Sequence, residues 1–252
     1  MKAVILCGGL GKRFSEETIY KPKPMILVGK FPILFHILKI YEKHGINDFI
    51  LALGYKSEKI KKFFNAKNLN KLNDTYYKYL KKKPKELNWK ITFCYSGLKT
   101  MTGGRLLRLK QLLKKEKNFL LTYGDGLANV DIKKLIKFHI KHKKIGTVTA
   151  VTPSARFGAL DIEDKKVKSF SEKPQSGEGW INGGFFCFQN KIFNYLKNDK
   201  TVLEEDPLSK LSKHKNLYAF KHHKYWQCMD TKRDHDLLVN QWKSKKILWL
   251  KN

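Results

Sequence analysis

The first residues with catalytic potential form a glycine-rich turn, GGLGKR, at positions 8–13. An apolar run at 3–7 predicts a strand that leads directly into this turn. Glycines allow backbone N–H groups to line up on phosphate oxygens. The turn is not a P-loop, because Arg13 stands where serine or threonine is needed, and Phe14 replaces the third glycine of a dinucleotide fingerprint. We interpret it as a turn that binds a polyphosphate, with Arg13 as a planar donor, although such turns are purely structural about as often.

Two lysines that each precede a proline follow the turn, in the sequence KPKP at 21–24. A proline holds the preceding residue in an extended conformation, so Lys21 and Lys23 present their ammonium groups on a stiff segment. A solvated basic turn is the structural alternative. The position of both lysines shortly after the glycine-rich turn favours a phosphate-binding role.

Two aspartates are candidates for holding a metal ion. Asp125 lies between two glycines directly after an apolar run at 119–122, and Asp230 precedes a predicted helix at 231–242. Magnesium on a nucleotide takes one or two protein carboxylates, while phosphate oxygens and water complete its shell. We therefore predict that Asp125 and Asp230 share a magnesium ion. For Asp230, capping of the helix is the structural alternative.

Two further pairs of polar residues lie in the second half of the chain. The carboxylate of Glu172 and the amide of Asn182 suit sugar hydroxyls, whereas Lys173 suits a monoester phosphate as a point charge. Each motif alone is a weak signal. We expect this half of the chain to carry a second substrate.

The elements that must position these residues alternate between apolar runs and amphipathic stretches. Strands are predicted at 3–7, 49–53, 91–95, 119–122 and 147–151, and helices at 33–44, 57–64, 104–113 and 132–142. This alternation predicts an α/β fold with a mainly parallel sheet flanked by helices. The strands of such a sheet end at a common edge, where a ligand crevice is expected.

Beyond residue 157 the pattern changes to shorter strands, and helical stretches return nearer the end of the chain. Strands are predicted at 159–162, 167–170 and 184–188, and helical stretches at 192–196, 206–213 and 231–242. We expect these strands to extend the same sheet. We predict one domain over 1–252, with 1–156 mainly binding nucleotide and 157–252 mainly binding the sugar phosphate. Residues 65–88 show no periodicity and are expected to form an inserted excursion.

The composition limits the class of protein. The formal net charge is +30, and 47 of the 52 basic residues are lysine. We attribute the lysines to residue usage, with a polyanion-binding protein as the alternative, and expect the retained arginines to mark sites that need a bidentate donor. Four cysteines without CxxC spacing argue against disulfides and a zinc site and imply a reducing cytoplasm. Since no signal peptide and no apolar run of 18 residues is found, we expect an unexported protein. Surface or helix-end positions outside catalysis are expected for His36, His44, His139 and His142.

The order of the motifs resembles the sugar-1-phosphate nucleotidyltransferases over essentially the whole chain. The motifs are GGLGKR, SEETIYKPKPM, TMTGGR, YGDG, RFGALDI, EKP, WINGGFF and WQCMDT. The second, third and seventh are typical of the cytidylyl-transferring branch. The resemblance implies a Rossmann-like mixed sheet, CTP and glucose 1-phosphate as substrates, Mg²⁺ as cofactor and a homo-oligomer, with a hexamer as the assembly that the family suggests. It also implies that the product feeds the synthesis of CDP-deoxysugars and of surface polysaccharide (O-antigen).

The resemblance also assigns roles to residues at matching positions. The nucleotide-binding residues implied in this way are Leu6, Gly8, Gly9, Gly11, Lys12, Arg13, Lys23, Thr100, Arg105 and Gly124. The implied sugar-phosphate-binding residues are Gly158, Glu172, Lys173, Asn182 and Gly183. Catalysis is assigned to Arg13, Lys23, Asp125 and Asp230, the two aspartates as the metal ligands. The sequence departs from the family pattern at three places, but none removes a charge that catalysis needs. They are Lys12 in place of threonine, Cys228 in place of proline, and the stretch 202–207, which in the family normally begins with tryptophan.

The expected reaction needs neither an activating base nor a covalent nucleophile on the protein. A sugar 1-phosphate is largely dianionic near neutral pH, because the second pKa of a phosphate monoester is about 6. Catalysis should therefore rest on placing this anion in line with the α-phosphorus and on neutralising charge. Nothing in the residue chemistry reads the base, so transfer from UTP or dTTP stays an alternative.

Overall fold

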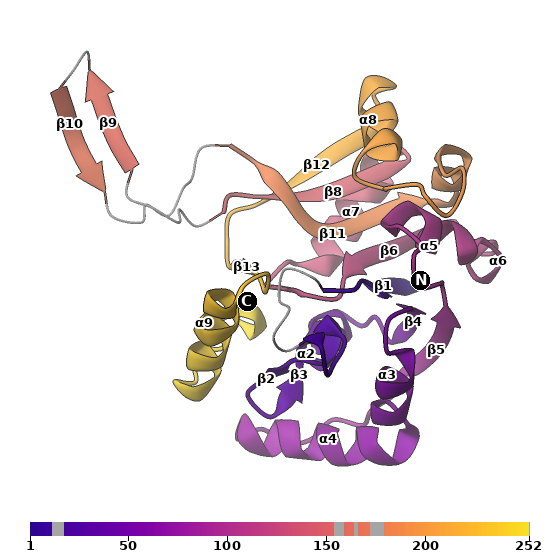
Figure 1. Cartoon of the computed structure of the whole chain (residues 1–252), viewed down its shortest axis with the longest axis vertical. Coiled ribbons are helices and arrows are strands. Elements are labelled where there is room, and N and C mark those ends of the chain that lie inside the picture. The colour runs from indigo at the N-terminus through magenta and orange to yellow at the C-terminus, as the bar shows by residue number, and fades with distance from the viewer. Residues whose placement is uncertain (12–17, 154–158, 164–165, 172–178, 252) are drawn as a thin grey trace.

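The structure is a computed structural model, which describes residues 1–11, 18–153, 159–163, 166–171 and 179–251. Its centre is a seven-stranded sheet in the order β12-β8-β11-β6-β1-β4-β5 (Figure 1). The strands are β1 (Ala3–Cys7), β4 (Asp48–Leu53), β5 (Lys90–Tyr95), β6 (Asn118–Tyr123), β8 (Gly146–Val151), β11 (Ile181–Gln189) and β12 (Leu217–His222). β11 pairs antiparallel with both β6 and β8, while the other pairs in this sheet are parallel. The predicted α/β class with a mainly parallel sheet is thus confirmed.

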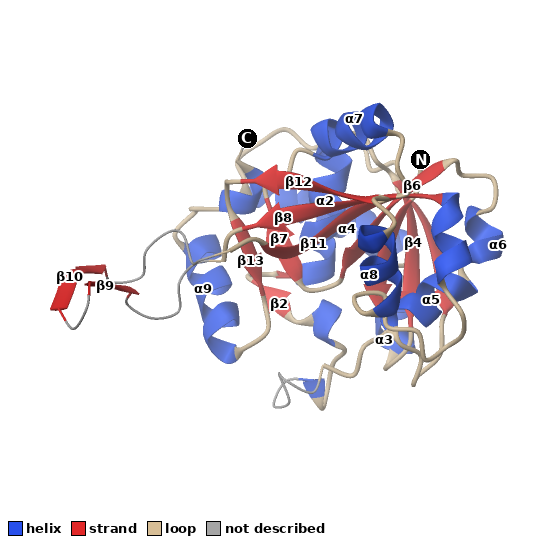
Figure 2. Ribbon diagram, turned by 90° about the horizontal axis from the view of Figure 1, so that it is seen from above, coloured by secondary structure: helices blue, strands red, loops and turns tan. Residues whose placement is uncertain are grey.

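Helices cover both faces of the sheet (Figure 2). They are α2 (Ile33–Lys43), α3 (Ser57–Phe63), α4 (Ala66–Tyr79), α5 (Thr102–Arg108), α6 (Lys110–Leu113), α7 (Ile132–His142), α8 (Asp206–Lys213) and α9 (Lys232–Lys243), with 3₁₀ turns η2 (Lys23–Met25), η3 (Asn190–Tyr195) and η4 (Leu248–Leu250). Successive residues of β1 serve two cores, as the alternation of a strand requires. Ile5 packs in the core that contains α2, and Val4 packs in the core that contains α5 and α6. No helix in the described parts of the chain is both long and apolar enough to cross a membrane.

Three small two-stranded sheets supplement the central one. They are β2 (Leu27–Val28) with β3 (Phe31–Pro32), β7 (Gly126–Ala128) with β13 (Trp226–Cys228), and β9 (Ala159–Glu163) with β10 (Lys166–Ser171). The β9–β10 hairpin stands apart from the rest of the molecule (Figure 1). The expectation that these two strands extend the central sheet was therefore wrong, whereas β11 does extend it.

The segment 65–88 contains a regular helix, which corrects the prediction that it lacks periodicity. In α4, Leu69 and Tyr76 are buried, and Leu72 and Tyr79 pack partly buried against the same core. These four positions recur every three or four residues, which places them on one face of the helix. The pattern was missed because two of its four members are tyrosines, set among many lysines and asparagines.

Two of the four histidines expected at surfaces or helix ends are buried. His36 is 0% exposed, and its Nε2 lies 3.0 Å from the carbonyl oxygen of Val28. Its ring also packs edge-on against Trp242, with a centroid distance of 4.9 Å. His139 is 1% exposed, and its Nδ1 lies 2.8 Å from the Thr147 hydroxyl. Both histidines therefore belong to the packing of the core.

The burial of His36 predicts a loss of stability in mild acid. Removal from water lowers the pKa of His36 to about 4, against about 6.5 in an unfolded chain. Between these values the unfolded chain binds a proton that the folded chain does not, so stability falls as the pH is lowered through this window. His36 alone should cost about 2 kcal/mol of unfolding free energy between pH 7.5 and pH 5.

Urea unfolding at the two pH values measures this loss. The variant His36→Gln keeps a donor near Val28 but does not titrate, so its loss should be about 2 kcal/mol smaller than that of the wild type. An identical pH dependence of the two proteins would contradict the assignment.

Candidate active site

A cavity of about 930 Å³ opens at the carboxyl ends of β1 and β6 and collects residues from both halves of the chain. The predicted residues on its wall are Leu6, Gly8, Gly9, Gly11, Lys23, Thr100, Arg105, Gly124, Asp125, Asn182, Gly183 and Asp230. This is the edge of the sheet at which α/β proteins bind ligands. The other predicted residues, Lys12, Arg13, Gly158, Glu172 and Lys173, lie outside the described residues.

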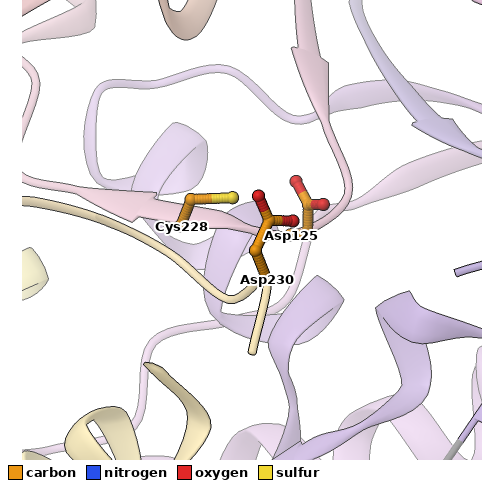
Figure 3. Close-up of side chains that lie close together, drawn as sticks. All are labelled: Asp125, Cys228 and Asp230. Carbon is orange, nitrogen blue, oxygen red and sulfur yellow. The ribbon is translucent and has the colours of Figure 1, made fainter. Parts of the chain in front are cut away.

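Lys23 and the two predicted metal ligands form one group in this cavity. The Nζ of Lys23 lies 2.7 Å from Oδ2 of Asp125 and 2.6 Å from Oδ1 of Asp230. Figure 3 shows the side chains of Asp125 and Asp230 close together, with Cys228 beside them. One ligand atom from each of these three residues lies within 4.8 Å of the others. The structure therefore brings together Lys23, Asp125 and Asp230, which are each more than 100 positions apart in sequence.

The pairing of two short strands sets the distance between the aspartates. Asp125 directly precedes β7, and Asp230 follows β13 by one residue. In the antiparallel pair, Cys228 of β13 stands opposite Gly126 of β7. The N–H of Met229 also donates to the carbonyl oxygen of Asp125 at 2.9 Å. Both carboxylates are thus fixed to the same end of one small sheet.

The capping alternative for Asp230 is wrong. Thr231 is the N-cap of α9, because its hydroxyl accepts a hydrogen bond from the N–H of Asp234 at 3.2 Å. The carboxylate of Asp234 completes the capping box by accepting from the N–H of Thr231 at 2.9 Å. Asp230 therefore does not cap the helix and instead lines the cavity, where it pairs with Lys23.

The charges in this group favour a bound cation. Burial alone would lower the pKa of Lys23, but the charge of Asp125 and the hydrogen bonds that Lys23 donates to Asp125 and Asp230 raise the pKa instead. Burial and the neighbouring charge of Asp125 raise the pKa of the Cys228 thiol, so this thiol stays protonated and is a poor ligand. Two carboxylates that already hold an ammonium group between them are a suitable donor pair for a hard divalent cation.

Arg105 is buried beside the glycine-rich turn and binds its backbone through a hydrogen bond. The side chain is 4% exposed, and its Nη2 donates to the carbonyl oxygen of Gly8 at 2.9 Å. Its Nη1 donates to the carbonyl oxygen of Gly97 at 2.7 Å and to the Ser96 hydroxyl at 2.9 Å. A Cβ on Gly8 would lie 1.9 Å from Nη1 of this guanidinium, so a side chain at this position would displace Arg105 from its hydrogen-bond partners. Arg105 thus uses both of its terminal nitrogens to bind loops of the cavity, as expected of a retained arginine. A contact between Arg105 and the nucleotide stays a prediction.

The cavity residues that the sequence reasoning missed include four with polar groups that form hydrogen bonds: Thr102, Tyr123, Glu204 and Trp226. The carboxylate of Glu204 accepts hydrogen bonds from the hydroxyls of Thr102, at 2.6 Å, and Tyr123. The indole Nε1 of Trp226 donates to the carbonyl oxygen of Gly183 at 2.7 Å. Tyr123 directly precedes Gly124 and lies two positions before the predicted metal ligand Asp125. This position could have identified Tyr123 as a cavity residue. Glu204 lies in a loop before α8 and carries no such signal.

The chain is similar in sequence and in structure to known nucleotidyltransferases. The family described as "Nucleotidyl transferase" matches residues 2–235. The chain is 46% identical to "Glucose-1-phosphate cytidylyltransferase" of Salmonella typhi, over 99% of this chain and 98% of that protein. It is 43% identical to "Probable glucose-1-phosphate cytidylyltransferase" of Bacillus subtilis, over 99% of each chain. The structure of HddC from Yersinia pseudotuberculosis complexed with GMP-PN is similar, with a TM-score of 0.70 at 26% identity over 96% of this chain and 99% of that one.

Proposed function

This chain belongs to the nucleotidyl transferase family, and we propose that it transfers the cytidylyl group of CTP to α-D-glucose 1-phosphate, giving CDP-glucose and pyrophosphate. The observation that carries the proposal is one cavity that contains the glycine-rich turn, Lys23 with its two aspartates, and Asn182. The names of the two similar proteins support CTP and glucose 1-phosphate as the substrates.

The proposed mechanism assigns one task to each part of the cavity. The backbone of the glycine-rich turn, held by Arg105, binds the triphosphate. The ammonium group of Lys23 neutralises charge on the reacting phosphates. We propose the same role for Arg13 and Lys173, which are not among the described residues. Asn182 and Gly183 orient the sugar, so that its phosphate oxygen attacks the α-phosphorus in line with the departing pyrophosphate. No residue needs to remove a proton, because the attacking phosphate is already largely ionised.

We propose Mg²⁺ as the cofactor, with Asp125 and Asp230 as its protein ligands. The two carboxylates converge on one place and already hold the ammonium group of Lys23. When bound there, Mg²⁺ would supply positive charge to the phosphates of the nucleotide. Since Lys23 and the metal ion would compete for the same carboxylate oxygens, we expect Lys23 to turn towards phosphate when both substrates are bound.

The remaining parts of the proposal concern assembly and location. The resemblance supports a homo-oligomer, for which a hexamer is the suggested form, and light scattering tests this. The isolated β9–β10 hairpin offers surface for a second copy, since two-stranded sheets are marginally stable alone. All four cysteines are free, which supports a reducing compartment such as the cytoplasm. We further propose that CDP-glucose feeds the synthesis of CDP-deoxysugars and O-antigen.

A nucleotide panel tests the proposed function. The protein is incubated with glucose 1-phosphate, Mg²⁺ and either CTP, UTP or dTTP, and pyrophosphate release is measured. We expect turnover with CTP and a kcat/KM at least about tenfold lower with the other two nucleotides. Turnover with UTP or dTTP but not CTP would overturn the assignment of the base. Absence of turnover with all three, together with tight binding of RNA, would favour the polyanion-binding alternative suggested by the net charge of +30.

A further inference from the structure

Glu204 places a third carboxylate on the wall of the cavity. Unlike Asp125 and Asp230, which pair with the ammonium group of Lys23, it accepts hydrogen bonds from hydroxyl groups. Both of its oxygens accept hydrogen bonds, one from the Thr102 hydroxyl at 2.6 Å and one from the Tyr123 hydroxyl. Thr102 begins α5 and Tyr123 ends β6, so Glu204 links two elements of the nucleotide-binding half. The N–H of Leu203 also donates to the Thr102 hydroxyl at 2.9 Å, which ties the loop of Glu204 to the same helix.

The hydrogen-bonded chain continues to the sugar side of the cavity. Nδ2 of Asn182 donates to the Tyr123 hydroxyl at 3.2 Å. Oδ1 of Asn182 accepts from the N–H of Gly184 at 2.8 Å. Gly184 has a φ of +78°, and a Cβ there would lie 2.6 Å from the Tyr123 ring, so glycine permits this close approach. The Asn182 amide keeps one N–H and one oxygen lone pair for a ligand.

Glu204 sets the direction of the hydrogen bonds that the Tyr123 hydroxyl makes, whereas the N–H of Gly184 fixes Oδ1 of Asn182 as an acceptor. A carboxylate can only accept, so the Tyr123 hydroxyl must donate to it and must accept from Asn182. The Tyr123 hydroxyl has one proton, which it donates to Glu204. A neutral amide in place of Glu204 could donate to the Tyr123 hydroxyl instead, which would allow this hydroxyl to turn its proton towards Asn182 and so lose the hydrogen bond from Nδ2.

The carboxylate of Glu204 also favours the hydroxyl groups of a substrate over its phosphate groups at this wall of the cavity. The charges of Asp125 and Asp230 face Lys23, whereas Glu204 accepts hydrogen bonds from two uncharged hydroxyls among the described residues. A phosphate near Glu204 would meet a like charge in a partly buried place, which is costly. A hydroxyl group would instead find polar partners. The wall formed by Glu204, Tyr123 and Asn182 therefore suits the hydroxylated part of a substrate.

We propose that Glu204 is a positioning residue that determines sugar specificity, by holding Tyr123 so that the Asn182 amide meets a sugar hydroxyl in one orientation. This inference rests on the proposed function. It adds a residue that does not itself bind the metal or the reacting phosphates. Its effect should appear in the choice of sugar and in the KM for the sugar phosphate, while the chemical step is left largely intact.

The test compares Glu204→Gln and Tyr123→Phe with the matched control Glu205→Gln. Glu205 is the exposed neighbour, and its replacement removes the same charge one position away. Each variant is assayed with CTP and glucose 1-phosphate, galactose 1-phosphate or mannose 1-phosphate. For both test variants we expect the KM for glucose 1-phosphate to rise about tenfold, the preference over the two epimers to fall about tenfold, and the KM for CTP to change less than about twofold. Because both residues act on one amide, the double variant should be little worse than either single one.

The possible outcomes are distinct. Kinetics like those of Glu205→Gln, or an equal rise of the KM for CTP with unchanged sugar preference, would overturn the inference. Fully additive effects of the two substitutions would also overturn it. If Glu204→Gln fails to fold in a melting experiment, Tyr123→Phe, which leaves the carboxylate in place, decides alone. A wild-type protein that does not use CTP and glucose 1-phosphate would instead refute the proposed function.

Discussion

Replacing Lys23 by alanine should remove most of the turnover, whereas replacing Lys21 should leave most of it. Lys23 is 9% exposed, and its ammonium group lies between Asp125 and Asp230, while Lys21 is exposed. An electrostatic contact that acts on the reacting phosphates in a site shielded from water is worth about two to three orders of magnitude in kcat. Pyrophosphate release measured across CTP concentrations gives kcat and KM for both variants. Equal values for the two would contradict the assignment of Lys23 to the reacting phosphates.

The variant Lys23→Arg is a sharper version of the same experiment. It keeps the charge but replaces a compact ammonium by a planar fork. Two carboxylates and an incoming phosphate leave little space around Nζ, so we expect CTP binding to be kept and kcat to fall. A wild-type kcat in this variant would show that charge alone is sufficient.

Thermal stability provides a readout of the same residue that does not depend on activity. Without Lys23, the carboxylates of Asp125 and Asp230 face each other without the cation that lies between them. In EDTA, Lys23→Ala should therefore melt about 3–8 °C below Lys21→Ala. Adding Mg²⁺ should recover more of this difference than it adds to the wild type, because the metal ion replaces the missing charge. A melting temperature of Lys23→Ala that does not respond to Mg²⁺ would contradict the proposed metal site.

The second large effect is expected for Asp125→Ala and Asp230→Ala. Either substitution should lower kcat by two or more orders of magnitude, since both carboxylates are proposed to hold one Mg²⁺. The double variant should be little worse than either single one, because one lost ligand already disables the site. The fold should survive, since both side chains are partly exposed to the cavity and the cap of α9 is Thr231.

The matched control is Asp236→Ala, which removes an exposed carboxylate from α9 that lies 3.5 Å from Lys232. It should leave kcat unchanged. Activity is measured over a wide range of Mg²⁺ concentrations, so that weakened binding is separated from a lost chemical step. Near-normal activity of Asp230→Ala at every concentration would remove this residue from the proposed site.

The parts of the fold that could be predicted from the sequence are those with uninterrupted apolar runs. The strand predicted at 3–7 is β1, and the helix predicted at 132–142 is α7, with the same bounds. Such segments bury a whole face, so their pattern is visible without knowing their neighbours. The edge strand β12 was missed, because several of its side chains are exposed and its pattern is weak.

The parts of the site that could not be predicted depend on pairings distant in sequence. Motif order placed Asp125 and Asp230 together, but only the three-residue strands β7 and β13 fix their separation. These strands are too short to show a period. Glu204 contacts the hydroxyl of Tyr123 across 81 positions and the hydroxyl of Thr102 across 102 positions, and no local pattern predicts such contacts. Lys23 between the aspartates was likewise beyond prediction, because spacing alone does not say which carboxylate a lysine meets.

The direction of β11 has a consequence for how such a protein can change over generations. β11 runs against its neighbours, so its first residues lie where the parallel strands end, and Asn182 stands opposite Ala150 near the end of β8. The side of the cavity that we propose for the sugar therefore lies at the start of a strand, whereas the side that we propose for the nucleotide follows the end of β1. Substitutions or changes of length ahead of β11 can alter the sugar that is accepted without disturbing the turn after β1. The fold thus lets acceptor and donor preferences diverge independently among descendants of one ancestral gene.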